Sequence, residues 1–186
     1  MRDARPSRIL SRSRLLAAWQ DSRDATKDPG RPGIDEMSAL QFSSKLETNI
    51  ASLAKSIRDG NYGPSRLRAI LIPKPNSSTK RLICIPTIKD RLVQRTIIEY
   101  LVRTRRLPDN PASYGFTRGR GTAAAILRAI DLRAKHDWCI KTDIESFFDR
   151  IPRDELKARV QRALPACSLV PLINKVIDCE ISETAG

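Results

Sequence analysis

Apolar residues recur at helical spacing in the stretch 38–58 of this chain. They occur every three or four positions, as Leu46, Ile50, Leu53 and Ile57. This period is typical of an amphipathic helix that turns one face toward a core. Gly60 follows as a stop signal. The pattern therefore predicts a helix over 38–58.

Other stretches carry signals for the start of a helix. Thr87 and Asp90 form the pattern of a capping box, which predicts a helix from there to about residue 103. Pro152 fits a first helical turn, where Asp154 and Glu155 are favourable because the helix N-terminus carries a partial positive charge. Helices are also expected over 15–24, 122–135 and 168–179.

Two strand-like runs, 67–73 and 80–86, flank the turn-forming residues 74–79, which predicts a hairpin. A short alternating run, 138–140, predicts a further strand that leads into a core. The elements do not alternate as βαβ units, so the expected fold class is α+β. A chain of 186 residues can form one domain or two small lobes.

The charge of the chain points to a polyanionic partner. Lys and Arg number 34 against 21 acids, a formal net charge of +13. The stretch 66–106 holds eleven basic residues and two acids, and so carries +9 of that total. A solvated face would interleave both signs, so we expect this stretch to face nucleic acid.

Composition also excludes several classes of protein. No apolar run approaches the roughly 20 residues of a membrane span. Cys84, Cys139, Cys167 and Cys179 form no CxxC pair, which argues against a zinc site and predicts buried thiols in a reducing compartment such as the cytoplasm. The first 14 residues carry five Arg. They faintly resemble a mitochondrial transit peptide, but we favour a basic arm that contacts nucleic acid.

The segment 141–149 carries the main candidate for catalysis. Asp143 follows the expected strand, and Phe147 and Phe148 come soon after. A carboxylate at a strand end can hold Mg²⁺ where a triphosphate binds. Mg²⁺ prefers oxygen ligands and is usually bound by one or two carboxylates together with the phosphates of the substrate. Phe148 would lie under the sugar and exclude a 2′-hydroxyl, whereas Phe147 is expected in the core. The alternative is that Asp143 caps a turn and both rings are core.

The hairpin supplies two candidate cations for a triphosphate. Lys74 follows the first strand as a point charge, and Arg81 begins the second with a fork that grips two oxygens. Taken singly, each is as readily a solvated hairpin residue.

The order of motifs resembles bacterial reverse transcriptases, most closely the group II intron and retron-like branch. The motifs are Ile72-Pro73-Lys74-Pro75-Asn76, the runs 81–87 and 89–94, Ser113-Tyr114-Gly115-Phe116, and 143–149. The resemblance implies a partial right-hand polymerase, with helical and hairpin fingers and an incomplete palm sheet. It implies a basic N-terminal extension over 1–32, fingers over 33–86, the first part of the palm over 87–150, and a helical segment over 151–186.

The resemblance also assigns roles to residues. Asp143 would be the first catalytic aspartate and a metal ligand, and the backbone carbonyl of Ile144 would also bind Mg²⁺. Lys74, Arg81 and Phe148 would bind the nucleotide. Four residues would face template, primer or triphosphate: Arg91, Gln94, Arg118 and Arg120. The family's glycine loop reads Gly-Phe-Arg-Pro-Gly-Arg-Ser, whereas Thr117 and Arg118 stand in its third and fourth places here.

The implied partners are an RNA template, a DNA or RNA primer and dNTPs. The family's second acidic motif, aromatic-x-Asp-Asp, does not occur in these residues. We therefore expect the chain alone to be inactive, with the remaining palm and thumb in a missing segment, lost from a truncated gene or supplied by a second polypeptide. The alternative is a non-catalytic RNA-binding remnant or a maturase-like component of a ribonucleoprotein. A merely structural basic protein is a weaker third option.

Overall fold

The computed structural model describes residues 5–25, 30–73, 75, 78–106, 110–115, 117, 119–147 and 150–182. It forms two compact units. Unit 1 comprises Met1–Arg106 and Arg153–Gly186, and unit 2 comprises Leu107–Pro152. These bounds follow from contacts within the fold, so the polymerase lobes expected from the sequence stay a prediction.

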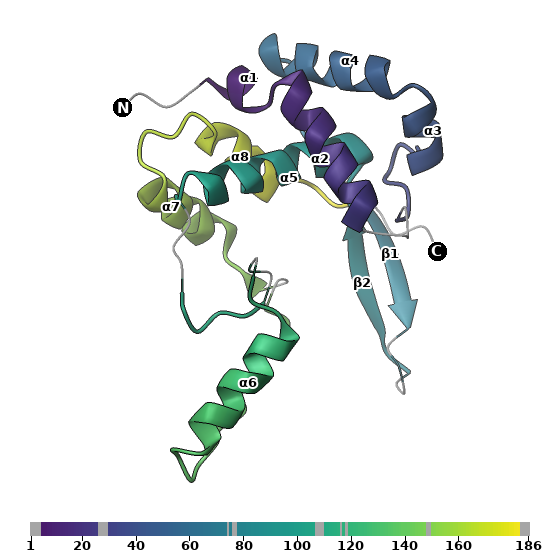
Figure 1. Ribbon diagram of the computed structural model, residues 1–186. Coiled ribbons are helices and arrows are strands. Elements are labelled where there is room, and N and C mark those ends of the chain that lie inside the picture. The colour runs from purple at the N-terminus through teal and green to yellow at the C-terminus, as the bar shows by residue number, and fades with distance from the viewer. Residues whose placement is uncertain are drawn as a thin grey trace. The chain divides into compact units, whose positions relative to one another are not determined.

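Unit 1 is mostly helical, and a two-stranded hairpin projects from its helices (Figure 1). Its elements are α1 (Pro6–Ile9), α2 (Arg12–Ala25), α3 (Ala39–Ser44), α4 (Leu46–Arg58), β1 (Arg68–Pro73), β2 (Lys80–Ile85), α5 (Ile88–Arg103), α7 (Arg153–Ala163) and α8 (Val170–Ile177). The hairpin and the helices expected near 15–24, 88–103 and 168–179 are confirmed. Helix α7 begins one residue after Pro152.

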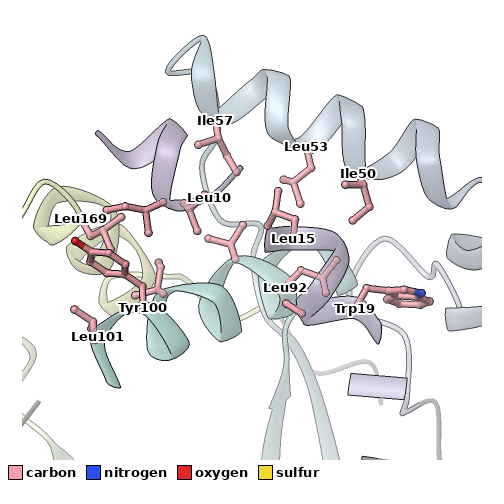
Figure 2. Close-up of a cluster of buried hydrophobic side chains, with 14 of the residues drawn as sticks. Leu10, Leu15, Trp19, Ile50, Leu53, Ile57, Leu92, Tyr100, Leu101 and Leu169 are labelled. Carbon is pink, nitrogen blue, oxygen red and sulfur yellow. The ribbon is translucent and has the colours of Figure 1, made fainter. Parts of the chain in front are cut away.

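The core of unit 1 lies where α2 contacts α4 and α5. Leu15 on α2 is fully buried, and Ile50 and Leu53 on α4 and Leu92 on α5 turn toward the same cluster (Figure 2). At one end, the rings of Trp19 and Phe42 pack with their centroids 5.0 Å apart. The apolar face predicted over 46–57 is therefore the face that α4 buries.

The predicted helix over 38–58 is two helices that are separated at Lys45. Ser38 caps α3 through a capping box with Gln41. At the other end of α3, the Ser44 hydroxyl donates to the Gln41 carbonyl, and the Asn49 amide donates to the Phe42 carbonyl. These side chains satisfy carbonyl groups that a continuous helix would bond to backbone N–H groups, which explains the break.

The N-terminal residues differ from the expected basic arm. Residues 6–9 form α1, and Ile9 and Leu10 are fully buried in the core. The basic residues alternate with apolar ones, so the backbone packs against the core and leaves arginines such as Arg8 and Arg12 exposed. Any contact of these arginines with nucleic acid stays a prediction.

Strands β1 and β2 pair antiparallel, with Arg68 opposite Ile85 and Pro73 opposite Lys80. The base of this hairpin is joined to α5 by Asp90, which is 2% exposed. Its carboxylate accepts from the Thr87 hydroxyl at 2.6 Å and from the Ser65 backbone N–H at 3.1 Å. The predicted cap at Thr87 is confirmed, since its hydroxyl also accepts from the Asp90 N–H. Both ends of the hairpin are thereby fixed to one helix start.

Unit 2 contains α6 (Thr122–Arg133), which confirms the helix expected there. The strand expected over 138–140 is wrong, because these residues have no regular structure. Trp138 is 90% and Ile140 is 87% exposed. A strand needs a neighbour for its N–H and C=O groups, and within the described residues of unit 2 no segment pairs with this run.

The described elements give a mixed fold of helices with a small two-stranded sheet. This composition agrees with the expected α+β class at the coarse level. Cys167 is buried as expected, but Cys139 is exposed because it lies in the irregular run. Among the described helices, none combines the length and apolar character needed to cross a membrane.

Candidate functional site

Asp143 lies in an exposed, irregular segment of unit 2, immediately before a turn. Glu145, Ser146 and Phe147 form this turn, and Ser146 adopts a φ of 53°, which is uncommon for a residue other than glycine. The Arg150 N–H donates to the Ser146 carbonyl at 3.1 Å and closes the turn. The acid is therefore presented to solvent beside a locally defined backbone.

The chemistry of this segment fits part of a magnesium site. The Asp143 carboxylate and the Ile144 carbonyl supply oxygen atoms, and Mg²⁺ usually binds one or two carboxylates together with substrate phosphates. Across the part of the chain that the structure describes, no cluster of three or more His, Cys, Asp or Glu side chains has the arrangement of a complete metal site. Asp143 and Ile144 would thus hold the ion only together with other oxygen ligands.

Of the two aromatic residues of this segment, Phe147 belongs to the described residues and Phe148 does not. Phe148, the expected sugar gate, lies outside the described residues. Phe147, expected in the core, is 48% exposed, because the strand that was to carry this segment into a core does not form.

Arg81 is the second residue of β2 and lies opposite Ile72 in the hairpin register. Its side chain is exposed. A guanidinium in this place is free to turn toward a phosphate, because the hairpin fixes its backbone and solvent surrounds its head group. Lys74, the other expected triphosphate ligand, lies outside the described residues.

Arg91 is packed against the loop that precedes α3. Its Nη2 donates to the Arg31 carbonyl at 3.3 Å, and its Nε is buried without a partner among the described residues. Burial lowers the pKa of Arg91, and the negative charge of Asp35 opposes this shift. The guanidinium thus makes a structural contact here, and the expected contact with nucleic acid stays a prediction. Gln94, one turn along α5, is half-buried.

Arg120 holds the loop before α6. Its Nη1 donates to the Asn110 carbonyl at 2.8 Å, and its backbone forms an antiparallel bridge with Thr117. The side chain is half-buried by these contacts. Of the two arginines that the sequence left as candidates in this loop, Arg120 has a structural contact, and Arg118 lies outside the described residues.

The expected site residues are divided between the two units. Arg81, Arg91 and Gln94 belong to unit 1, where β2 and α5 carry them. Unit 2 contains Asp143, Ile144 and Arg120. The convergence of the hairpin cations and the acid around one nucleotide therefore stays a prediction.

Sequence reasoning missed part of the hydrogen-bond network around Asp90. The Thr87–Asp90 spacing identified the helix cap, but Tyr62 and Ser65 also bond to the same carboxylate. Burial, followed by the hydrogen bond to Asp90, raises the pKa of the Tyr62 hydroxyl far above its ordinary value. No local pattern marks these partners, because they lie more than twenty positions away from Asp90 in the chain.

Comparison with known proteins gives consistent matches across the chain. The family model described as reverse transcriptase (RNA-dependent DNA polymerase) matches residues 72–184. Protein YkfC of Escherichia coli K12 is 26% identical over 183 residues, which are 95% of this chain and 48% of that protein. The group II intron-encoded protein LtrA of Lactococcus lactis is 27% identical over 170 residues, which are 91% of this chain and 28% of LtrA.

A third relative is also similar. An uncharacterized 91 kDa protein in the cob intron of Schizosaccharomyces pombe is 32% identical over 130 residues, 69% of this chain and 16% of that protein. The chain thus spans about half or less of the length of each of these relatives.

Proposed function

This chain belongs to the reverse transcriptase family, and from that premise we propose that it is part of an RNA-directed DNA polymerase. The expectation of this family from the sequence motifs is confirmed by the match over 72–184. The proposed reaction joins dNTPs to a DNA or RNA primer on an RNA template. In it, the primer 3′-hydroxyl bonds to the α-phosphorus and pyrophosphate leaves.

The observation that carries this proposal is that one family match includes the end of β1, all of β2 and the acidic segment. It begins within β1, contains Arg81 and extends past Asp143. The hairpin gives Arg81 a fixed backbone and an exposed head group, and the turn at 145–147 presents the Asp143 carboxylate to solvent. Both features suit groups that must meet a charged ligand.

Each of these residues has a distinct task in the proposed reaction. Asp143 and the Ile144 carbonyl would hold Mg²⁺, which would polarise the phosphoryl oxygens and neutralise developing charge when bound. Arg81, with Lys74, would bind the triphosphate and orient it, since preorganised cations stabilise charge where it develops. Phe148 would exclude a ribose 2′-hydroxyl and so favour dNTPs.

Arg91, Gln94, Arg118 and Arg120 would contact template, primer or triphosphate. Of these, Arg91 and Arg120 also have structural partners, so each would in addition hold a loop in place. The proposal applies to a protein that carries these residues together with a second acidic motif, whether in the same polypeptide or in another.

The high positive charge supports one other function. The stretch 66–106 alone carries +9, which suits an RNA-binding component of a ribonucleoprotein without catalysis. The name of LtrA refers to a group II intron, so an intron RNA is the ligand to consider first under this alternative.

One experiment separates the two functions. A DNA primer annealed to an RNA template is incubated with dNTPs, Mg²⁺ and a form of the protein that contains the second acidic motif. Template-directed extension that stops when EDTA is added supports the polymerase. Salt-dependent binding of the same duplex, without any incorporation over several Mg²⁺ concentrations, would support the binding protein instead.

A further inference from the structure

A shallow groove of about 950 Å³ lies beside the start of β1 in unit 1. Its floor forms because the segment 180–182 runs parallel to the chain that leads into β1, with Leu67 bridged to Ile181. The Leu67 N–H donates to the Glu180 carbonyl at 2.8 Å, and the Ser182 N–H donates to the Leu67 carbonyl at 2.8 Å. Backbone hydrogen bonds therefore hold the floor in place.

Three arginines from two segments of the sequence line this groove: Arg66 and Arg68 beside the start of β1, and Arg153 at the start of α7. Arg66 forms an ion pair with Glu180 at 2.7 Å, so its charge is largely neutralised. Neither Arg68 nor Arg153 has an acidic partner within 4 Å among the described residues. Arg68 is also half-buried, and no acid among the described residues balances its charge.

One further feature favours an anion in the groove. The Ser182 hydroxyl accepts from the Ala69 N–H at 3.2 Å and keeps its own proton for donation to a ligand. Glu36, an acid without an ion-pair partner among the described residues, also lines the groove and would weaken binding of an anion.

We propose that this groove binds the phosphodiester backbone of a nucleic-acid strand, with Arg68 and Arg153 as the phosphate contacts. A guanidinium fork matches the geometry of a phosphate. Among the described residues, the lining holds no aromatic ring for a base to stack on, so the groove suits backbone contacts, which position a strand without reading its sequence. This inference rests on the proposed function in one respect, which is that the bound strand would be the RNA template.

The test measures binding of an unstructured 12-nucleotide RNA to the full 186-residue chain by fluorescence anisotropy, over a series of salt concentrations and without Mg²⁺. For the double variant R68Q/R153Q, we expect the slope of log K against log salt to fall by about 1.4, since each lost contact on a single strand removes about 0.7. At low salt, we expect an affinity loss of about tenfold. R153Q alone, at an exposed position that folding tolerates, should lower the slope by about 0.7.

The matched control is R159Q/R162Q, which removes the same charge from exposed positions on α7 that do not line the groove. If this control lowers the slope as much as R68Q/R153Q, binding follows net charge and the groove proposal is wrong. The variant R68K/R153K keeps both charges and should retain most of the wild-type slope. A loss of slope in R68K/R153K equal to that in R68Q/R153Q would also overturn the proposal.

Competition with sodium tripolyphosphate distinguishes a strand from a free triphosphate. If the groove binds a strand, R68Q/R153Q should bind RNA more weakly than wild type does. Tripolyphosphate should then compete only weakly with RNA for the wild-type protein. If the double variant loses tripolyphosphate binding but keeps its RNA affinity, the groove binds small anions, which contradicts the proposal. Because the assay contains no dNTP and no Mg²⁺, its outcome is independent of primer extension. If the protein binds RNA in this groove but does not extend primers, only the proposed polymerase function is wrong.

Discussion

The Tyr62 hydroxyl donates to the buried Asp90 carboxylate at 2.7 Å, across 28 positions of the chain. Together with the bonds from Ser65 and Thr87, it fixes the segment before β1 to the start of α5, where β2 ends. The hairpin that presents Arg81 is therefore anchored at its base by one carboxylate. The position of the proposed triphosphate ligand depends on this anchor.

Replacing Tyr62 by Phe removes this donor and leaves an oxygen of Asp90 short of a partner. Leaving a buried acceptor unsatisfied costs about 1–3 kcal/mol, so Tyr62→Phe should lower the free energy of unfolding by about that amount. Urea unfolding measured by circular dichroism checks the change. Tyr114→Phe is the matched control, since Tyr114 has no side-chain hydrogen bond among the described residues. Equal losses in the two variants would contradict the anchoring role of Tyr62.

The same tyrosine predicts how stability depends on alkaline pH. Burial raises the folded-state pKa of Tyr62 above its ordinary value of 10.0, so the folded protein keeps this proton when the unfolded chain loses it. The stabilisation is complete below about pH 10 and declines as the pH rises further, by up to about 1.4 kcal/mol per pH unit.

This prediction is checked by the free energy of unfolding at pH 9, 10 and 11. Wild type should lose more stability between pH 10 and 11 than Tyr62→Phe does. Burial also raises the pKa of the Cys179 thiol, which adds a decline from about pH 9, but this group is present in both proteins and cancels in the comparison. Parallel curves for the two proteins would show that Tyr62 is not the group responsible.

Gly33 approaches the start of α5 so closely that a side chain has no room there. A Cβ at this position would lie 2.7 Å from the backbone N and Cα of Thr87. Because backbone atoms cannot move aside cheaply, Gly33→Ala should lower the free energy of unfolding by about 1–3 kcal/mol, as overpacking does. Gly63→Ala serves as the control, because no atom lies within 4 Å of its Cβ. Thermal unfolding compares the two, and similar melting temperatures would contradict the close packing at Gly33.

Local patterns predicted the elements that have local causes. The spacing of Leu46, Ile50 and Leu53 identified the buried face of α4, and the Thr87–Asp90 pattern located the start of α5. The hairpin followed from two apolar runs around a turn. Each of these signals lies within a few residues of the structure that it predicts, and each was confirmed.

The features that the sequence did not predict depend on individual side-chain hydrogen bonds or on partners far away in the chain. The break at Lys45 arises from side-chain hydrogen bonds of Ser44 and Asn49, and a run of helical spacing does not reveal them. The run at Trp138 has the alternation of a strand but no strand beside it in the described part of unit 2. The groove at Arg68 depends on residues 180–182, more than 100 positions later.

The candidate site was predicted through the order of its motifs. That order identified the family, which the match over 72–184 confirms. The roles of Asp143 and Arg81 came from resemblance and from the chemistry of oxygen ligands and cations. Whether they meet at one nucleotide depends on packing between units, which short patterns do not determine.

The central claim is that the Asp143 carboxylate holds a metal ion for nucleotide transfer, and primer extension with Asp143→Asn tests it most directly. The assay uses an RNA template, a DNA primer, dNTPs and Mg²⁺, with a form of the protein that contains the second acidic motif. Asp137→Asn, which removes an equal charge at a nearby exposed position, is the control. The claim predicts that Asp143→Asn lowers the extension rate by at least about 1,000-fold, equivalent to about 4 kcal/mol of transition-state stabilisation. The RNA affinity of Asp143→Asn should be unchanged, and Asp137→Asn should extend the primer at the wild-type rate. Extension by Asp143→Asn at the wild-type rate would contradict it.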